Sequence, residues 1–318
     1  MARTRPGRSC PRHYRYSPAV FARAADLKAQ SLYVVGGLYG NPFALEAVLD
    51  LARREGATLA FNGDFNWFDA DPEGFRAINE TVLQHAALRG NVETELAGED
   101  AGAGCGCGYP QWVGDAEVQR SNEILRRLRE TARGFPDLRA RLGGLPMHLV
   151  AEVGGLRVGI AHGDAESLAG WQFSQEALRE RPERAQALLA GAAVDVFACT
   201  HTCLPVMQDF ATPRGTAFIV NNGAAGMPNF RDARFGLATR IASVPSMEAL
   251  YGARLGAIVV EAVPVRYDHE AWLARFDRVW PAGSPASVSY RKRIASGPGY
   301  DVEQALRTSS NGALSRAA

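Results

Sequence analysis

The sequence predicts an α/β protein in which short strands alternate with helices. Two observations carry this prediction. Apolar runs of three to five residues precede amphipathic stretches between residues 32 and 91, and each run ends in a polar or glycine-rich turn. In an open α/β sheet such turns gather at the carboxyl ends of the strands, so we expect the functional site along that edge.

The first half of the chain contains the clearest alternation. The pattern predicts strands over residues 32–35, 58–61 and 86–88, and helices over residues 42–54 and 72–85. The turns that follow the strands are Gly36-Gly37, Asn62-Gly63-Asp64 and Arg89-Gly90-Asn91. Asp64 and Asn91 are therefore expected to lie near each other.

The middle of the chain interrupts this alternation. A glycine-rich loop over residues 101–110 is followed by predicted helices over residues 116–133 and 136–141. We interpret residues 95–145 as an inserted, cap-like segment that borders the site.

The second half is rich in predicted strands, at residues 147–153, 156–161, 194–198, 217–220 and 257–265. Gly154-Gly155 predicts a hairpin turn, because glycine reaches positive φ at little cost. A last short helix is expected over residues 270–276. The predicted organisation is an irregular N-terminal arm (1–25), a main domain (26–280) and a C-terminal extension (281–318).

Composition excludes several classes of protein. The chain is 47% hydrophobic and its formal net charge is +1, which favours a folded core and indicates no nucleic-acid-binding surface. No run approaches the length of a membrane span, and residues 1–16 lack the apolar segment of a secretory signal. The basic arm is expected to be a solvated tail, or else to contact phosphate. Five cysteines without an export signal predict reduced thiols and a cytoplasmic protein.

Five short motifs follow one another at the predicted strand ends. They are Gly37-Leu38-Tyr39-Gly40-Asn41, Gly63-Asp64, Gly90-Asn91-Val92-Glu93, His162-Gly163-Asp164 and Thr200-His201-Thr202-Cys203-Leu204-Pro205. Their order and wording resemble the calcineurin-like metallophosphoesterases, and bacterial phosphodiesterase-like members in particular, over roughly residues 32–270. The resemblance implies a sandwich of two mixed β-sheets flanked by helices.

The resemblance also implies a metal site that is only half retained. Members of this family hold two metal ions that share one bridging aspartate. The ligands of the second ion correspond here to Asp64, Asn91, His162 and His201. The remaining ligand positions of the first ion hold Gly37, Tyr39 and Cys203, if Pro205 is matched to the proline of the family motif.

The four retained residues suit one divalent ion. A carboxylate, an amide oxygen and two imidazoles are ligands for Mn²⁺, Fe²⁺, Zn²⁺ or Ni²⁺. We expect a metal-bound hydroxide to be the nucleophile. Val92 replaces the histidine that protonates the leaving group in the family, which favours good leaving groups. A decayed site that only makes hydrogen bonds is the alternative.

Other residues are candidates for the substrate pocket or for further metal binding. The pocket candidates are Tyr39, Asn41, Cys203, Arg89 and Trp171. Tyr39 and Cys203 could instead fill volume, ligate metal or form a covalent link. Arg89, Arg12 and Arg15 are candidates for the positive charge of the lost ion. Cys10, Cys105, Cys107 or Cys203 could rebuild a second metal site, although Cys-x-Cys spacing is unusual for zinc.

These observations predict a divergent, single-metal phosphoesterase, more specifically a phosphodiesterase. Its partner would be a small-molecule phosphoester, with no membrane or nucleic acid involved. One alternative is an inactive binding or scaffold protein on the same fold. Another is a mononuclear metalloenzyme with redox chemistry. The substrate, the metal and the oligomeric state do not follow from the sequence.

Overall fold

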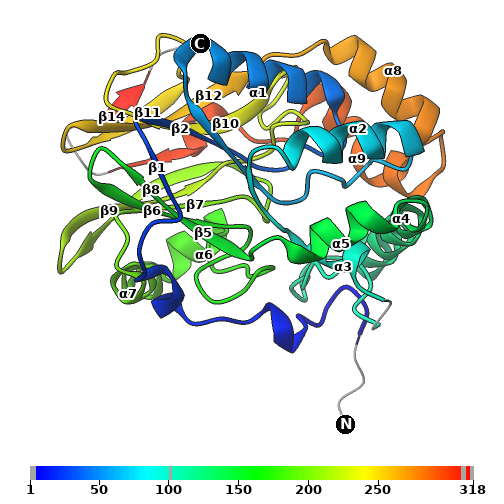
Figure 1. Ribbon diagram of the computed structural model, residues 1–318, viewed down its shortest axis with the longest axis horizontal. Helices are drawn as coiled ribbons and strands as arrows, with labels where there is room; N and C mark the ends of the chain where they lie inside the picture. Colours follow the sequence, from blue (N-terminus) through cyan, green and yellow to red (C-terminus); the bar gives the residue numbers. More distant parts are fainter. Residues whose placement is uncertain (1–4, 100–101, 309–312, 316–318) are drawn as a thin grey trace.

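Two seven-stranded mixed sheets, flanked by helices, form the centre of the protein (Figure 1). This computed structural model describes residues 5–99, 102–308 and 313–315. Parts of the predicted arm (1–4), inserted segment (100–101) and C-terminal extension (309–312 and 316–318) lie outside the described residues. The α/β sandwich predicted from the motif order is confirmed.

The first sheet contains three neighbouring parallel strands, β6, β7 and β9, with antiparallel strands beside them. Its strand order is β1 (Leu27–Ala29), β5 (His148–Val153), β6 (Leu156–Ala161), β7 (Val196–Cys199), β9 (Gly215–Asn221), β8 (Val206–Thr212) and β13 (Leu306–Arg307).

The second sheet contains the parallel strands β2, β3 and β4, which are the three strands predicted in the first half of the chain. Its strand order is β14 (Ala313–Ser315), β11 (Tyr251–Leu255), β12 (Ile258–Val265), β10 (Gly236–Ala242), β2 (Ser31–Val35), β3 (Thr58–Asn62) and β4 (Ala86–Leu88).

Strand β2 shows how the sandwich is packed. Leu32 and Val34 belong to the apolar core between the two sheets, whereas Tyr33 and Val35 belong to the core beneath the helices. Alternate side chains of a strand point to opposite faces, so a strand buried on both faces is apolar throughout. That burial explains the continuous apolar run in the sequence.

Helices cover the outer faces of both sheets. Figure 1 shows α1 and α8 above one sheet and α6 and α7 below the other. The helices are α1 (Pro42–Glu55), α2 (Pro72–Val82), α3 (Asn91–Ala97), α4 (Asp115–Arg133), α5 (Pro136–Gly144), α6 (Gln175–Glu180), α7 (Pro182–Ala192), α8 (His269–Val279) and α9 (Pro285–Ser296).

Several elements were not predicted from the sequence, namely β8, β10, β11, α3, α6, α7 and α9. Strand β10 is buried along its whole length, and its Arg240 is paired there with Glu55 and Glu261. Helix α9 has the sequence PASVSYRKRIAS, in which few apolar residues recur at helical spacing. Tertiary contacts, rather than local periodicity, stabilise these elements.

The described part of the N-terminal arm is packed against the rest of the chain, so the expectation of a solvated tail is wrong. The arm is irregular, with two short 3₁₀ turns at Arg12–Tyr14 and Pro18–Phe21. The Tyr14 hydroxyl donates to Glu95 at 2.7 Å, and the Phe21 ring meets the Phe197 ring edge-on at 5.0 Å between centroids.

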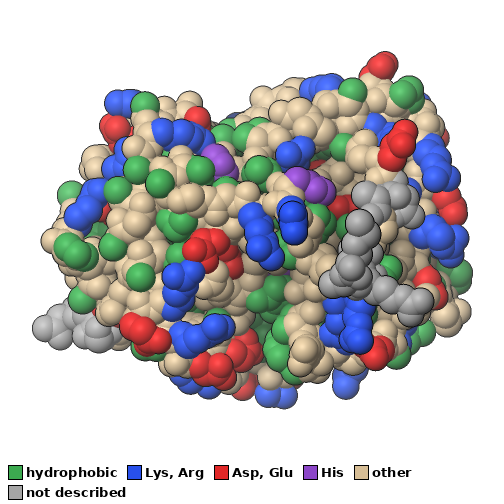
Figure 2. Space-filling view, turned by 90° about the horizontal axis from the view of Figure 1, so that it is seen from below, with side chains coloured by type: hydrophobic (Ala, Val, Ile, Leu, Met, Phe, Trp, Pro, Cys, Tyr) green, Lys and Arg blue, Asp and Glu red, His purple; other side chains and the backbone are tan. Residues whose placement is uncertain are grey.

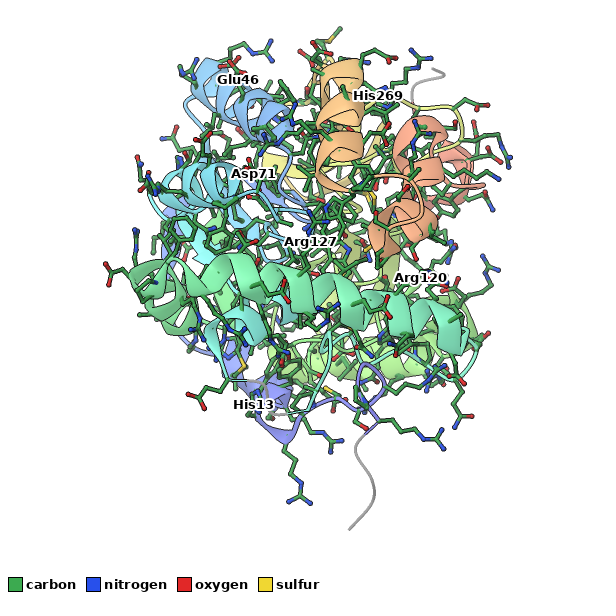
Figure 3. All side chains as sticks on the ribbon, turned by 90° about the vertical axis from the view of Figure 1, so that its right-hand side faces the viewer. His13, Glu46, Asp71, Arg120, Arg127 and His269 are labelled. Atoms are coloured by element: carbon green, nitrogen blue, oxygen red, sulfur yellow. The ribbon has the colours of Figure 1, made fainter. Side chains whose placement is uncertain are left out.

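The inserted segment and the C-terminal extension contact each other. Figure 3 shows α4 crossing one side of the molecule, with Arg120 and Arg127 toward α8 and α9. Arg120 donates to Ser289 of α9 at 2.6 Å, and the Arg127 guanidinium lies 4.4 Å from the Trp280 ring. The Arg120 contact holds α9 against α4, and the Arg127 contact holds the end of α8 there. The proposed domain boundaries stay predictions.

The surface charges and the cysteines agree with the near-neutral net charge and the reduced thiols expected from the sequence. On the face drawn in Figure 2, Lys and Arg side chains are interspersed with Asp and Glu. Among the described residues, no helix combines the length and apolar character needed to cross a membrane. All five cysteines are free thiols.

Candidate metal centre

Four polar residues meet where strands of the two sheets end. Asp64 follows β3, Asn91 follows β4 as the first residue of α3, His162 follows β6 and His201 follows β7. All four side chains are buried. The structure thus brings together the residues that the sequence placed on one metal ion.

Their donor atoms converge on one small volume. His162 Nε2 lies 3.3 Å from Asp64 Oδ2, 3.1 Å from Asn91 Oδ1 and 3.2 Å from His201 Nδ1. One donor atom each from Asp64, His162 and His201 all lie within 4.8 Å of one another. This spacing suits ligands that surround a single ion.

Backbone carbonyls determine which nitrogen of each histidine is free. His162 Nδ1 lies 2.9 Å from the Asn62 carbonyl, and His201 Nε2 lies 2.8 Å from the Cys107 carbonyl. A carbonyl oxygen only accepts, so these nitrogens carry the hydrogens. When both imidazoles are neutral, His162 Nε2 and His201 Nδ1 direct lone pairs at each other and toward Asp64. Such a cluster of acceptors fits a cation at its centre.

The Asn91 amide is oriented in the same way. Its Nδ2 donates to the Cys105 carbonyl at 2.9 Å, which leaves Oδ1 directed at His162. The glycine-rich loop therefore contributes backbone carbonyls that hold two of the four candidate ligands.

The ionisation of the site makes metal binding depend on pH. Burial, together with the neighbouring His162 imidazole, lowers the pKa of His201 to about 4. Burial opposes a charge on His162, but the Asp64 carboxylate outweighs it and raises the pKa of His162. Burial alone would raise the pKa of Asp64, yet His162 lowers it overall. A proton on His162 is therefore the group that an ion must displace.

Glu93 holds the Asp64 turn in place. Its carboxylate accepts hydrogen bonds from the backbone nitrogens of Asp64 at 2.7 Å and Gly90 at 2.9 Å. Burial, together with the Asp64 carboxylate, raises the pKa of Glu93 to about 7. Asp64 has a φ of 53°, a left-handed conformation that is costly for a residue other than glycine.

Gly63 and Gly90 allow the two turns to approach closely. A Cβ on Gly90 would lie 2.3 Å from Asp64 Oδ1, and one on Gly63 would lie 2.4 Å from the Gly90 nitrogen. Larger residues at either position would displace the ligand turns.

Tyr39 and Cys203, which the family resemblance assigns to positions of the first ion, contact each other. Tyr39 Oη lies 2.8 Å from Cys203 Sγ, and a Cβ on Gly37 would lie 2.7 Å from Tyr39 Cζ. Tyr39 and Cys203 have φ values of 56° and 61°, so both share the strained conformation of Asp64. Burial raises the pKa of the Tyr39 phenol and of the Cys203 thiol.

A cavity of about 150 Å³ opens onto the metal ligands. The Trp171 ring lies 5.4 Å from the His201 ring, and its Nε1 donates to the Cys107 carbonyl at 3.0 Å. Trp112, which is 70% exposed, meets Trp171 edge-on at 5.7 Å. The other aromatic lining residues are Tyr39, Trp67, Tyr109 and Tyr290.

Two of the predicted pocket residues do not line this cavity. Asn41 is fully buried as the N-cap of α1, where its amide accepts from Phe43 and Ala44 and donates to Gly226. Arg89 turns away and donates to the Gly143 carbonyl at 2.7 Å. Both residues stabilise local structure, so their assignment to the pocket is corrected.

Arg12 and Arg15 are exposed on the arm, and neither lines the cavity. The arginine that does line it is Arg293 of α9. Nothing in the sequence pointed to this residue, because α9 lacks a clear pattern and lies about 90 positions after Cys203.

The cysteines do not rebuild a second site among the described residues. The cluster found there with metal-binding geometry comprises Asp64, His162 and His201, and no thiol belongs to it. Cys105 and Cys107 are buried. Their carbonyls contact Asn91 and His201, and the Cys107 sulfur accepts a hydrogen bond from the Asn91 amide at 3.6 Å.

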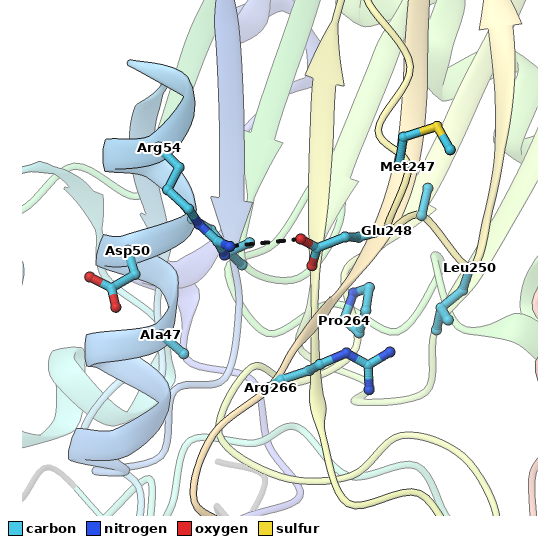
Figure 4. A pocket seen from close by; sticks show the side chains of 10 residues that line it. Ala47, Asp50, Arg54, Met247, Glu248, Leu250, Pro264 and Arg266 are labelled. Atoms are coloured by element: carbon cyan, nitrogen blue, oxygen red, sulfur yellow. Dashed lines mark ion pairs between the residues drawn. The ribbon is translucent and has the colours of Figure 1, made fainter.

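A larger cavity of about 670 Å³ lies between α1 and the segment that precedes β11 (Figure 4). Arg54 and Glu248 form an ion pair of 3.8 Å there. None of the predicted site residues lines this cavity.

Comparisons with known proteins rest on structure alone. No model of a known protein family matches the chain, and no curated protein does either. A hypothetical protein from Pyrococcus horikoshii OT3 aligns over 86% of this chain and 99% of its own, with 16% identity and a TM-score of 0.56. A metallophosphoesterase from Sphaerobacter thermophilus aligns over 85% of this chain and 100% of its own, with 18% identity and a TM-score of 0.55. The chain therefore has the calcineurin-like metallophosphoesterase fold, as the order of its five motifs predicted.

Proposed function

We propose that this protein is a divergent, single-metal phosphoesterase that acts on phosphodiesters. Asp64, Asn91, His162 and His201 would hold one divalent ion, with Mn²⁺, Fe²⁺, Zn²⁺ and Ni²⁺ as the candidates. The observation that carries the proposal is the set of acceptor atoms on four side chains that face one another within hydrogen-bonding distance.

The chemistry follows from the retained residues. A divalent ion in this site supplies Lewis acidity and lowers the pKa of water that it binds. Asp64 and the two imidazoles would fix the position of the ion. Glu93 holds the Asp64 turn, and the Asn62 and Cys107 carbonyls orient the two imidazoles. The cavity beside them admits a phosphoryl group.

The preference for good leaving groups rests on Val92. Its backbone nitrogen donates to Asp64 Oδ1 at 3.1 Å, but its side chain offers no proton to a leaving group. Esters whose leaving group is stable as an anion need no such proton, so we expect aryl phosphodiesters to be turned over faster than alkyl ones.

The first experiment is elemental mass spectrometry on protein purified without added metal or a histidine tag. We expect near one ion per chain in the wild type and near zero in His162→Ala. Turnover of bis(4-nitrophenyl) phosphate should follow the ion content. Two ions per chain would contradict the single-metal proposal.

Two other outcomes would indicate different functions. A protein that takes up no metal, even when metal is added, would be a binding or scaffold protein on this fold. The 2.8 Å contact between Tyr39 and Cys203 favours redox chemistry as the second candidate. Oxygen-dependent turnover of a substrate without phosphorus would support that candidate. The cytoplasmic location stays a prediction, which the free cysteines support.

A further inference from the structure

We propose that Arg293 binds the phosphoryl oxygens of the substrate and supplies the positive charge of the lost metal ion. This inference rests on the proposed phosphoesterase function. It assigns a substrate-binding role to a residue of the C-terminal extension, a part of the chain that contributes none of the metal ligands.

Helix α9 places Arg293 at the cavity. Tyr290 and Arg293, three positions apart and so on one helix face, both line it. Helix α9 is held beside the site by the 2.6 Å hydrogen bond from Arg120 to Ser289. The Tyr290 ring also contacts the Trp67 and Phe68 rings, with centroids 6.3 and 5.0 Å apart.

The guanidinium of Arg293 is only partly used within the protein. Its Nη2 donates to the Cys203 carbonyl at 2.7 Å, and its Nε reaches the Pro228 carbonyl at 3.4 Å. Nη1 takes part in no hydrogen bond identified among the described residues. The two carbonyls fix the plane of the guanidinium, and the side chain is half-buried rather than sealed.

The location of Arg293 matches the missing charge. The positions of the lost ligands hold a glycine, a phenol and a thiol, and Arg293 contacts the backbone of Cys203, one of the three. Of the residues that line the cavity, Arg293 is the one with a permanent positive charge, whereas Asp64 and Glu117 bring carboxylates. A phosphate anion entering this cavity would therefore find its cationic partner at Arg293.

Arginine suits this role for general reasons. Its planar guanidinium offers several donors to non-bridging phosphoryl oxygens and keeps its charge at all accessible pH values. In phosphoryl transfer, negative charge lies on these oxygens in the transition state, and an arginine that faces them lowers the barrier. One metal ion and one guanidinium would then share the task of two ions.

The test compares Arg293→Gln and Arg293→Lys with the matched control Arg291→Gln. Arg291 lies on the same helix, is exposed, and is paired with Asp277 through two contacts of 2.8 Å. Each protein is loaded with Mn²⁺, its ion content is measured, and its affinity for inorganic phosphate is determined by calorimetry. kcat and KM are then measured with bis(4-nitrophenyl) phosphate.

We expect Arg293→Gln to keep near one ion per chain, to bind phosphate at least tenfold more weakly and to lose about 100-fold in kcat/KM. Arg293→Lys should lose less, because lysine keeps the charge but not the planar donor set. Arg291→Gln should match the wild type. In a further variant, Arg293→Ala, added guanidinium should restore turnover.

The results separate this inference from the function on which it rests. Wild-type turnover together with unchanged phosphate affinity and kcat/KM in both Arg293→Gln and Arg293→Lys overturns the role of Arg293 alone. A wild type without turnover contradicts the proposed phosphoesterase activity. The phosphate titration still decides whether Arg293 binds the anion. If Arg293→Gln fails to fold, Arg293→Lys alone gives the comparison.

Discussion

At the residue scale, the candidate metal centre depends on side chains whose atoms facing away from the site are already hydrogen-bonded. His162 and His201 each donate to a backbone carbonyl, and Asn91 does the same through its amide. Such outer contacts fix the orientation of metal ligands and the nitrogen that faces the ion. Substitutions at these residues should therefore differ sharply from substitutions at the vacated positions.

His162→Ala should remove the ion, because it deletes the nitrogen that lies within 3.3 Å of three other donor atoms. Cys203→Ala should retain near one ion and lose the contacts of the thiol with the Tyr39 hydroxyl and the His201 carbonyl, at a cost of about 1 kcal/mol in stability. Elemental mass spectrometry and urea unfolding give the two readouts. Loss of the ion in Cys203→Ala would show that the thiol is a ligand.

Metal affinity should rise with pH through the neutral range. The pKa of His162 is raised by Asp64, so the metal-free protein holds a proton there that the ion must displace. Below that pKa, the Kd should increase roughly tenfold for each unit by which the pH falls, since one proton is released per ion. Competition with a chelating dye between pH 6 and 8 measures this slope. A Kd independent of pH would contradict protonation of His162.

At the scale of elements, the ends of β3 and β4 and the start of α3 form one unit. Glu93 in the first turn of α3 accepts from the turns after both strands. The sequence revealed the strands and their terminal polar residues. It did not reveal α3, because seven residues with little apolar periodicity are too few for a helix pattern.

Gly90→Ala should disturb this unit and Gly98→Ala should not. The new methyl at position 90 would lie 2.3 Å from Asp64 Oδ1, whereas at position 98 its nearest atom is the Thr94 carbonyl at 3.4 Å. Both glycines have negative φ, at the two ends of α3. We expect a loss of about 1–3 kcal/mol and weaker metal binding for Gly90→Ala. Urea unfolding and ion content provide the measurements, and equal behaviour of the two variants would contradict the close approach.

At the scale of the whole molecule, the candidate metal ligands come from both sheets. Asp64 and Asn91 follow strands of one sheet, and His162 and His201 follow strands of the other. An ion held by all four would join the two halves of the sandwich, so metal binding and folding should be linked.

Removal of the ion with a chelator should lower the melting temperature. At a free ion concentration 100 times the Kd, binding stabilises the folded state by about 3 kcal/mol. For a chain of this length that corresponds to roughly 5 °C. Scanning fluorimetry with and without chelator measures the shift, and His162→Ala should show none. A wild-type melting temperature that does not change when chelator is added would argue against a bound ion.

The sequence by itself determined the parallel strands of the first half, the order of the five motifs and the convergence of Asp64, Asn91, His162 and His201. The strands depend on local patterns, because apolar runs fix strands and parallel strands bring their ends to one edge, which places Asp64 near Asn91. The grouping of these two residues with His162 and His201 was implied by the family resemblance. Only the tertiary structure decided that Asn41 and Arg89 stabilise backbone elsewhere, that Tyr39 covers Gly37, and that Arg293 enters the cavity from α9. Such positions depend on packing between segments far apart in the chain, which no local pattern encodes.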